Sequence, residues 1–170
     1  MWVFDATPLI YLAKVDRLDL VDALDERRVI PRQVYDEVVE TGLDEGYPDA
    51  RRVEQAVENG QFDVVSIEQT TLVDRLSENQ QLSDADVAVL ACAAAHDGVA
   101  VMDEAYGRDV ADVEDITTRG TAYLVLLLAK TGAIDVDEAR SAIDAMVEKG
   151  WYCSPSVYAK ILQKLDSIDD

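Results

Sequence analysis

The chain of 170 residues has few of the side chains on which several common site chemistries depend. It contains one histidine, His96, and two cysteines, Cys92 and Cys153, which are far apart and form no CxxC or Cys/His spacing. Zinc sites and serine–histidine hydrolysis are therefore excluded as explanations of its function. We expect both cysteines to be small buried residues and His96 to lie on the surface near a helix C-terminus.

Long apolar runs, proline and glycine are also scarce. No run approaches the roughly 18–20 apolar residues that cross a bilayer, and the start MWVFDATPL lacks the basic segment and apolar stretch of a signal peptide. Only 4 Pro and 8 Gly interrupt a chain that is 49% hydrophobic, which argues against a disordered or collagen-like protein. We therefore expect one folded domain over residues 1–170, in the cytoplasm and without membrane association.

Basic residues are heavily outnumbered, with 15 Lys and Arg against 35 Asp and Glu, a formal charge of −20. The acids are spread along the whole chain, and at 1 M salt screening acts within about 3 Å and weakens their mutual repulsion. We therefore hypothesise a halophilic source. The same charge opposes the binding of polyanions at low salt, and it lowers the weight of any single acidic residue as a functional signal.

The hydrophobic pattern predicts short strands separated by helices. The predicted strands are residues 2–4, 29–31, 62–67 and 99–102. Predicted helices begin at Thr7-Pro8, with Thr7 as N-cap, then cover 18–24, a segment starting near Val34, 50–57, 84–95, 118–130, 136–148 and 155–165, with a loop at 42–48. Alternating strands and helices predict an α/β fold with a parallel sheet covered on both faces, whose ligands bind at the carboxyl ends of the strands.

Acidic residues follow the predicted strands or begin the helices after them. These acids are Asp5, Glu37, Asp84, Asp86, Asp103 and Glu104. Carboxylates that converge on one edge of a sheet repel one another unless a hard divalent cation, which prefers oxygen ligands, lies between them. Two cations about 3.5–4 Å apart activate water and stabilise the leaving oxygen in phosphodiester hydrolysis.

Each acid also has a purely structural interpretation. Asp5 and Asp103 are each placed to cap the helix that follows. Ser83 and Asp86 fit a capping box, Asp84 favours the helix dipole, and Glu37 fits a solvated charge on an exposed face. Spacing alone leaves both interpretations open.

Six stretches add a more specific signal. They are VFDATPLI at 3–10, VIPRQVYDEV at 29–38, LSDADVAVLA at 82–91, VMDEAYGRDVA at 101–111, and the GT and GWYCSPSVY segments at 120–121 and 150–158. In this order they resemble the PIN-domain nucleases over nearly the whole chain, in particular a VapC-related subgroup of archaea and bacteria. The resemblance implies a three-layer α/β/α sandwich with a mostly parallel central sheet, on which helices at about 135–168 pack.

The resemblance also implies a function. It suggests a ribonuclease that uses Mg²⁺ or Mn²⁺ and acts as the toxin of a toxin–antitoxin pair, with RNA as substrate, a cognate antitoxin as partner, and a homodimer. Carried over residue by residue, the catalytic acids are Asp5, Glu37, Asp86 and Asp103. These four are the implied metal ligands, with Asp84 beside or in place of Asp86 and Glu104 beside or in place of Asp103, while Thr7 supports Asp5 or a bound water. Apart from the resemblance, Arg108 and Arg119 are candidates for phosphate contact, Arg119 because it lies at the N-terminus of a predicted helix, and each fits an ordinary surface ion pair equally well.

Two positions depart from the family pattern. Ala6 stands where the subgroup usually has Thr, and Ser83-Asp84 stands where Gly-Glu is usual, so the carboxyl at Asp84 is one methylene shorter. Two other functions remain open. One is an aspartyl phosphatase-like enzyme with Asp5 as nucleophile, although Thr7 occupies the place of its usual second acid. The other is a non-catalytic nucleic-acid or protein interaction module whose acids reflect salt adaptation.

Overall fold

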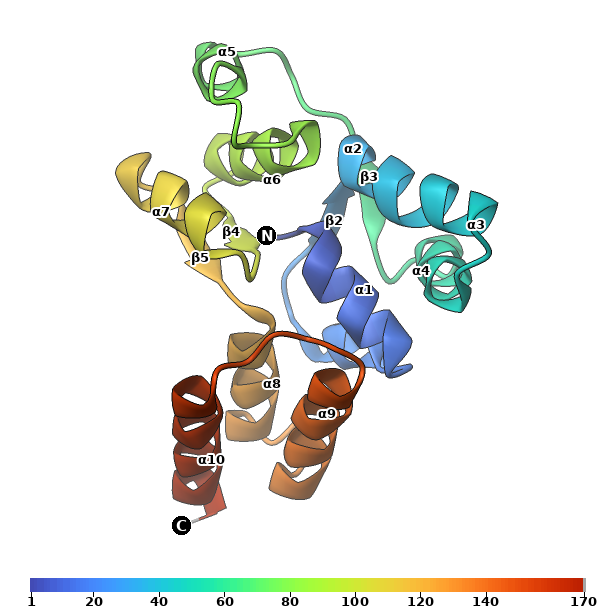
Figure 1. Cartoon of the computed structure of the whole chain (residues 1–170), viewed down its shortest axis with the longest axis vertical. Helices are drawn as coiled ribbons and strands as arrows, with labels where there is room; N and C mark the ends of the chain where they lie inside the picture. The colour runs from blue at the N-terminus through green and yellow to red at the C-terminus, as the bar shows by residue number, and fades with distance from the viewer. Residues whose placement is uncertain (170) are drawn as a thin grey trace.

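The computed structural model describes residues 1–169 and has a central sheet of five parallel strands (Figure 1). The strands are β1 (Trp2–Phe4), β2 (Arg28–Pro31), β3 (Asp63–Val65), β4 (Val99–Val101) and β5 (Thr117–Arg119). Their order across the sheet is β3-β2-β1-β4-β5. The expected parallel sheet is confirmed, and every pairing in it is parallel.

The sheet has one topological switch point, between β1 and β4. From β1 the chain moves outward through β2 to β3, and it then returns to place β4 and β5 on the other side of β1. Phe4 aligns with Val101, and the backbone N–H of Asp5 donates to the carbonyl of Val101 at 3.0 Å. The two strands therefore end side by side, and open α/β sheets bind ligands in the crevice beyond such a point.

Helices cover both faces of the sheet. The first group comprises α1 (Ala6–Lys14), the 3₁₀-helix η1 (Leu18–Ala23), α2 (Arg32–Tyr35), the π-helix η2 (Asp36–Thr41), α3 (Gly42–Asp44) and α4 (Pro48–Glu58). The second group comprises α5 (Thr71–Ser77), α6 (Asp84–Ala95) and α7 (Ala105–Val113). Figure 1 shows α1 and α6 on opposite sides of the sheet, and α2, which directly follows β2, contacts α6.

The core lies on both sides of β1 and β4. Helix α6 is rich in alanine, which lets it approach β1, β2 and β4 closely, and Leu90 is fully buried in it. On the sheet, the rings of Phe4 and Phe62 meet edge to face with centroids 5.1 Å apart. This packing fixes the ends of the central strands, from which the candidate site residues project.

The last three helices lie together at one end of the molecule (Figure 1). They are α8 (Thr121–Lys130), α9 (Val136–Glu148) and α10 (Pro155–Asp169). The connection between α9 and α10 passes beside α1, where the Tyr11 hydroxyl donates to the carbonyl of Gly150 at 3.3 Å. No helix in the described part of the chain is long and apolar enough to cross a membrane.

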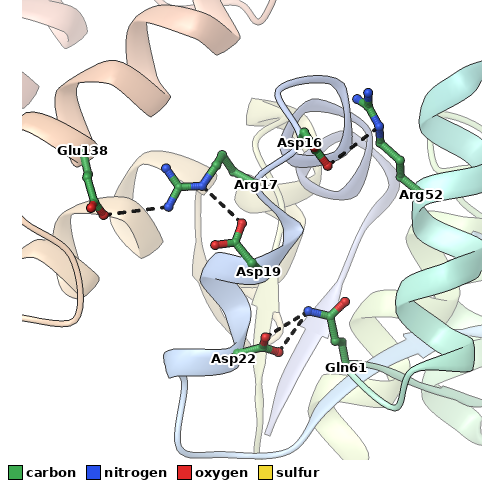
Figure 2. Close-up of polar contacts among 7 residues, drawn as sticks. All are labelled: Asp16, Arg17, Asp19, Asp22, Arg52, Gln61 and Glu138. Carbon is green, nitrogen blue, oxygen red and sulfur yellow. Dashed lines mark hydrogen bonds and ion pairs between the residues drawn. The ribbon is translucent and has the colours of Figure 1, made fainter.

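Polar contacts join η1 to its neighbours away from the strand ends (Figure 2). Arg17 contacts Asp19 at 3.2 Å and Glu138 of α9 at 3.9 Å, which links the start of η1 to the C-terminal helices. The side chain of Gln61 donates to both carboxylate oxygens of Asp22. These pairs are exposed, so each contributes only about 0–1 kcal/mol, and they orient the segments more than they stabilise them.

Several predicted boundaries are wrong. Thr7 does not cap α1, because Asp5 is the N-cap and its carboxylate accepts from the N–H of Ala6 at 2.8 Å. Pro8 is tolerated because backbone N–H groups in the first turn of a helix have no partner within the helix, so the one that proline lacks is not missed. Residues 117–119 form β5 rather than helix, since Gly120 caps α8. Asp103 does not cap α7, whose N-cap is Glu104.

Two other segments differ from their predictions, and one helix was missed. The segment 18–24 forms a 3₁₀-helix, and the predicted loop at 42–48 begins with the helical residues of α3. A Cβ at Gly42 would lie 2.6 Å from the Cβ of Ala50, so glycine is needed where α3 meets α4. Helix α5 was not predicted. His96 is exposed at the end of α6 and Cys92 is buried, as expected, whereas Cys153 is only half-buried.

Candidate active site

Asp5 lies at the switch point and is the only buried acidic side chain in the described part of the chain, with 7% of its surface exposed. It follows β1 directly, and one carboxylate oxygen accepts the hydrogen bond from the N–H of Ala6. A carboxylate placed here loses most of its hydration and receives one backbone donor in return. Its environment therefore disfavours the charged form.

The pKa of Asp5 is raised from 3.8 to about 7. Burial is the largest cause, the Ala6 hydrogen bond opposes it, and the negative charges of Asp86, Glu37 and Asp103 raise it further. Three carboxylates that are distant in sequence therefore act on Asp5. Asp84 and Glu104 are exposed and are not among the main causes of this shift.

Asp103 follows β4 and is held by three hydrogen bonds. The backbone N–H of Thr121 donates to Oδ1 at 2.8 Å, its hydroxyl donates to Oδ2 at 2.8 Å, and the indole Nε1–H of Trp151 donates to Oδ2 at 3.1 Å. Thr121 is the first residue of α8, so Asp103 caps that helix from a distant part of the chain. Such donors fix a carboxylate in one orientation.

Asp86 combines a structural role with its position near Asp5. Its carboxylate accepts from the N–H of Ser83 at 3.0 Å, while the Ser83 hydroxyl accepts from the N–H of Asp86 at 3.0 Å. This is the predicted capping box, and it is compatible with a functional role because it engages only one carboxylate oxygen. Asp84 is more exposed and lies almost opposite on the helix.

The other predicted residues lie around these acids. Glu37 is exposed on the π-helix η2, a helix type that often occurs at functional sites. Glu104 turns toward α7, because its Oε2 lies 3.5 Å from the place of a Cβ on Gly107. Thr7 is half-buried. The carboxylate of Asp5 accepts its hydrogen bond from the backbone N–H of Ala6 and not from the Thr7 hydroxyl. The buried Oε1 of Gln33, one helical turn before Glu37, has no donor within residues 1–169.

A family model described as a PIN domain (DUF3368) matches residues 1–167. The chain belongs to the PIN-domain family. The structure of VapBC-1 from nontypeable Haemophilus influenzae has a similar fold, with a TM-score of 0.50 and 14% identity over 71% of this chain and 97% of that chain. No curated protein matches the sequence. The predicted family and its α/β fold are therefore confirmed.

Nucleases of the PIN family generally use divalent metal ions, and the donors of this chain suit one. They are carboxylate oxygens, which hard cations prefer, and a cation would relieve the repulsion that raises the pKa of Asp5. Within the part of the chain that the structure describes, however, no three Asp, Glu, His or Cys side chains are arranged to hold a metal ion. Asp86 and Asp103 instead accept hydrogen bonds from N–H and O–H groups.

The two arginines predicted to contact phosphate lie beside Asp103 in this PIN domain. Arg108 is exposed on α7, and Arg119 is the last residue of β5, not the start of a helix as the sequence suggested. A Cβ on Gly120 would lie 2.9 Å from Asp103 Oδ1 and 3.4 Å from Arg108 Nη1. Glycine at this position therefore lets a carboxylate and a guanidinium flank the same point of the backbone.

Sequence reasoning missed the part that Thr121 and Trp151 play in this PIN domain. Both stand in segments that resemble the family, but nothing local marks them as partners of Asp103, which lies 18 and 48 residues away from them. The usable signals were a threonine at the start of an apolar helix and a tryptophan directly after a glycine. Neither signal identifies the acid it contacts.

Proposed function

We propose that this PIN-domain protein is a metal-dependent ribonuclease that hydrolyses RNA phosphodiester bonds with Mg²⁺ or Mn²⁺. The observation that carries the proposal is the state of Asp5. This acid is buried at the switch point of the sheet, and the charges of Asp86, Glu37 and Asp103 act on it. Glu37 is exposed and Asp86 and Asp103 are half-buried, yet their charges reach the buried Asp5, and a bound cation would compensate that repulsion.

In this mechanism each acid has a separate task. Asp5, Glu37, Asp86 and Asp103 would hold a divalent cation, which would neutralise phosphate charge and make water a stronger nucleophile. Asp5 provides a rigid carboxylate at the end of β1, and Asp103 keeps one orientation through Thr121 and Trp151. Arg108 and Arg119 bind and orient the phosphate backbone. No nucleophile from the protein is needed.

Cleavage of labelled single-stranded RNA in the presence of Mn²⁺ or Mg²⁺ tests the proposal. We expect Asp5→Asn and Asp103→Asn each to slow cleavage by roughly 100-fold or more, since even outer partners of a metal site are worth about 10–100-fold. Asp97→Asn is a matched control, because Asp97 is exposed just beyond the other end of the Asp86 helix. Asp84→Asn and Glu104→Gln decide which acid of each neighbouring pair binds the metal, and we expect both to retain activity.

Other outcomes of this assay would point elsewhere. Phosphate trapped on Asp5 after incubation with a phosphomonoester would indicate an aspartyl phosphatase-like enzyme. No cleavage, together with a melting temperature that divalent cations leave unchanged, would indicate a non-catalytic interaction module. Equal cleavage by the parent protein and by Asp5→Asn would contradict the metal-dependent mechanism.

We also propose that the protein is the toxin of a toxin–antitoxin pair, forms a homodimer and is masked by a cognate antitoxin. Membership of the PIN family and the fold shared with VapBC-1 support this role. Expression of the chain should arrest growth, Asp5→Asn should not, and the product of the neighbouring reading frame should restore growth. Light scattering on the purified protein tests the dimer. Normal growth with an active enzyme would contradict a toxin role.

We further propose that the protein works in the cytoplasm of a salt-loving cell. The net charge of −20 supports this, because self-repulsion at that charge falls as salt screens it. The free energy of unfolding should rise steadily between low and molar salt, measured by chemical denaturation at fixed pH. Full stability in dilute buffer would contradict the proposal.

A further inference from the structure

A cavity of about 310 Å³ lies beside Asp103, on the side away from β1. Its lining residues include Asp103, the arginines Arg108 and Arg119, and the tyrosines Tyr123 and Tyr152. The cavity thus places positive charge and aromatic surface next to an acid of the candidate active site. Its position allows one ligand to extend from the acids into the cavity.

The two arginines of the cavity are available to a ligand. Neither takes part in an ion pair among residues 1–169, although the chain carries 35 acids. Arg119 is held in place by a bond from Nη1 to the carbonyl of Thr118 at 2.8 Å, and its guanidinium lies 5.0 Å from the ring centroid of Tyr123. Its remaining donors are therefore positioned without being neutralised.

The aromatic surface of the cavity is unusually exposed. Tyr152 is 87% exposed, although its neighbour Trp151 is buried against Asp103. Tyr123 is 42% and Val157 is 44% exposed, so three of the six large hydrophobic residues that the described chain leaves exposed line this one cavity. Arg119 covers a face of the Tyr123 ring, which leaves Tyr152 as the free flat surface.

We propose that this cavity is a subsite for one unpaired nucleotide of a single-stranded RNA, adjacent to the phosphate that is cleaved. The base stacks on Tyr152, and Arg108 and Arg119 contact the phosphates on either side of it. Aromatic rings next to guanidinium groups bind single-stranded nucleic acid in this way, and stacking needs a base that is not paired. The inference rests on the proposed nuclease function and adds the residue that recognises a base of the substrate.

A second cavity supplies a built-in comparison. Tyr47 is 52% exposed and lies near Arg51 and Arg52, in a cavity that none of the candidate acids lines. There the Tyr47 hydroxyl donates to Glu45, and Arg52 donates to the carbonyl of Ala13 at 2.7 Å and pairs with Asp16. This cavity therefore combines a tyrosine with arginines away from the candidate acids, which makes it the matched control for the cavity beside Asp103.

Fluorescence anisotropy of a short labelled single-stranded RNA, measured with Asp5→Asn to prevent cleavage, tests the subsite. Adding Tyr152→Ala should weaken binding by roughly 5- to 100-fold, the range for loss of one stacked base. Tyr152→Phe should bind like the parent, because stacking uses the ring and not the hydroxyl. Arg108→Gln should reduce the slope of log affinity against log salt by about 0.7, the value for one phosphate contact on a single strand.

The matched control is Tyr47→Ala, which should leave binding unchanged, and an unlabelled duplex of the same sequence should compete poorly. The subsite is refuted if Tyr152→Ala binds like the parent, if Tyr47→Ala weakens binding equally, if the duplex competes as well as the single strand, or if no strand binds at low salt. Tyr152 is exposed, so its replacement leaves the fold intact, which thermal melting verifies.

The two proposals fail separately. If wild-type protein cleaves RNA but Tyr152→Ala binds normally, the subsite is wrong and the nuclease stands. If wild-type protein cleaves nothing but Asp5→Asn binds RNA through Tyr152, the subsite stands and the nuclease assignment is wrong.

Discussion

Asp5 and Asp103 follow neighbouring strands of the same sheet, yet their surroundings are opposite. Asp5 is buried, has one backbone donor and has its pKa raised to about 7. Asp103 is half-buried and accepts three hydrogen bonds from Thr121 and Trp151. The fold thus leaves the charge of one acid uncompensated, while it supplies donors to the other.

The two acids therefore contribute in different ways. Asp5 provides affinity for a cation, and Asp103 provides a carboxylate of fixed orientation. The uncompensated charge of Asp5 gives it the most to gain from a bound cation, whereas Asp103 already has donors that fix its direction. A site with two acids like Asp5 would be unstable, and one with two acids like Asp103 would have fewer oxygens free for the ion. The observed pair has one acid that gains from a bound cation and one acid whose direction is already fixed.

The largest expected change is in the free energy of unfolding when Asp5 or Asp103 is replaced by asparagine and no divalent cation is present. Asp5→Asn should stabilise the fold at pH 8 by on the order of 2–4 kcal/mol, because it removes a charge whose pKa is raised to about 7 while Asn still caps the helix. Asp103→Asn should instead destabilise it, because an amide group would face the N–H and O–H donors of Trp151 and Thr121. Urea denaturation measures both.

The pH dependence identifies the cause of the Asp5 effect. The folded state keeps the Asp5 proton up to a pKa of about 7, whereas the unfolded state loses it near 3.8, so the free energy of unfolding contributed by Asp5 falls as the pH rises between these values. The difference between wild-type protein and Asp5→Asn should be near zero at pH 4 and should grow toward pH 7. A constant difference across that window would assign the effect to packing.

Divalent cations should narrow the stability difference between the wild-type protein and Asp5→Asn. At a concentration of about 100 times its dissociation constant, Mn²⁺ should stabilise the wild-type fold at pH 8 by about 2.7 kcal/mol. Asp5→Asn should show little of this gain, since it lacks the carboxylate that benefits most. Calorimetry with and without Mn²⁺ measures the shift in melting temperature, and an equal shift in both proteins would mean that the ion binds elsewhere.

Trp151→Phe should weaken the anchoring of Asp103 while keeping an aromatic ring in the core. Loss of the Nε1–H bond to a charged oxygen should reduce stability by about 1.5–3 kcal/mol, and cleavage should slow through kcat with KM little changed. Tyr152→Phe is a neighbouring control on the exposed side of the same segment. Unchanged kcat would show that Thr121 alone orients Asp103.

Ser83→Ala should have the smallest effect. It removes the hydroxyl that caps α6 and should reduce stability by about 1 kcal/mol. The N–H of Ser83 that binds Asp86 is retained, so Asp86 keeps its orientation and cleavage should change little. A large loss of activity would show that the orientation of Asp86 depends on the complete capping box.

The sequence predicts the inner part of this fold better than its edge. Strands β1 and β4 are apolar runs that end in acids, and both the runs and the acids are visible in the sequence. Strand β5 reads Thr117-Thr118-Arg119 and has no such run; its pairing with β4 makes it a strand, and tertiary pairing is not encoded locally. Helix α3 begins at Gly42, where the close approach of Ala50 in α4 leaves room only for glycine, and this contact too is invisible in the local sequence.

The candidate site shows the same limit. The positions of Asp5 and Asp103 follow from the rule that ligands bind at strand ends, and Asp86 follows from the start of its helix. The raised pKa of Asp5 depends on burial and on three charges from other elements, and the anchoring of Asp103 depends on residues 18 and 48 positions away. Such properties require the three-dimensional structure.

The bond from Trp151 to Asp103 also determines when the site becomes complete during synthesis. Proteins are made from the N-terminus, so a nascent chain carries Asp5, Glu37, Asp86 and Asp103 long before residue 151 leaves the ribosome. Until then the carboxylate of Asp103 lacks the indole donor that helps to fix it. In the proposed nuclease, Asp103 would therefore be held by all three donors only after translation of the chain is almost finished.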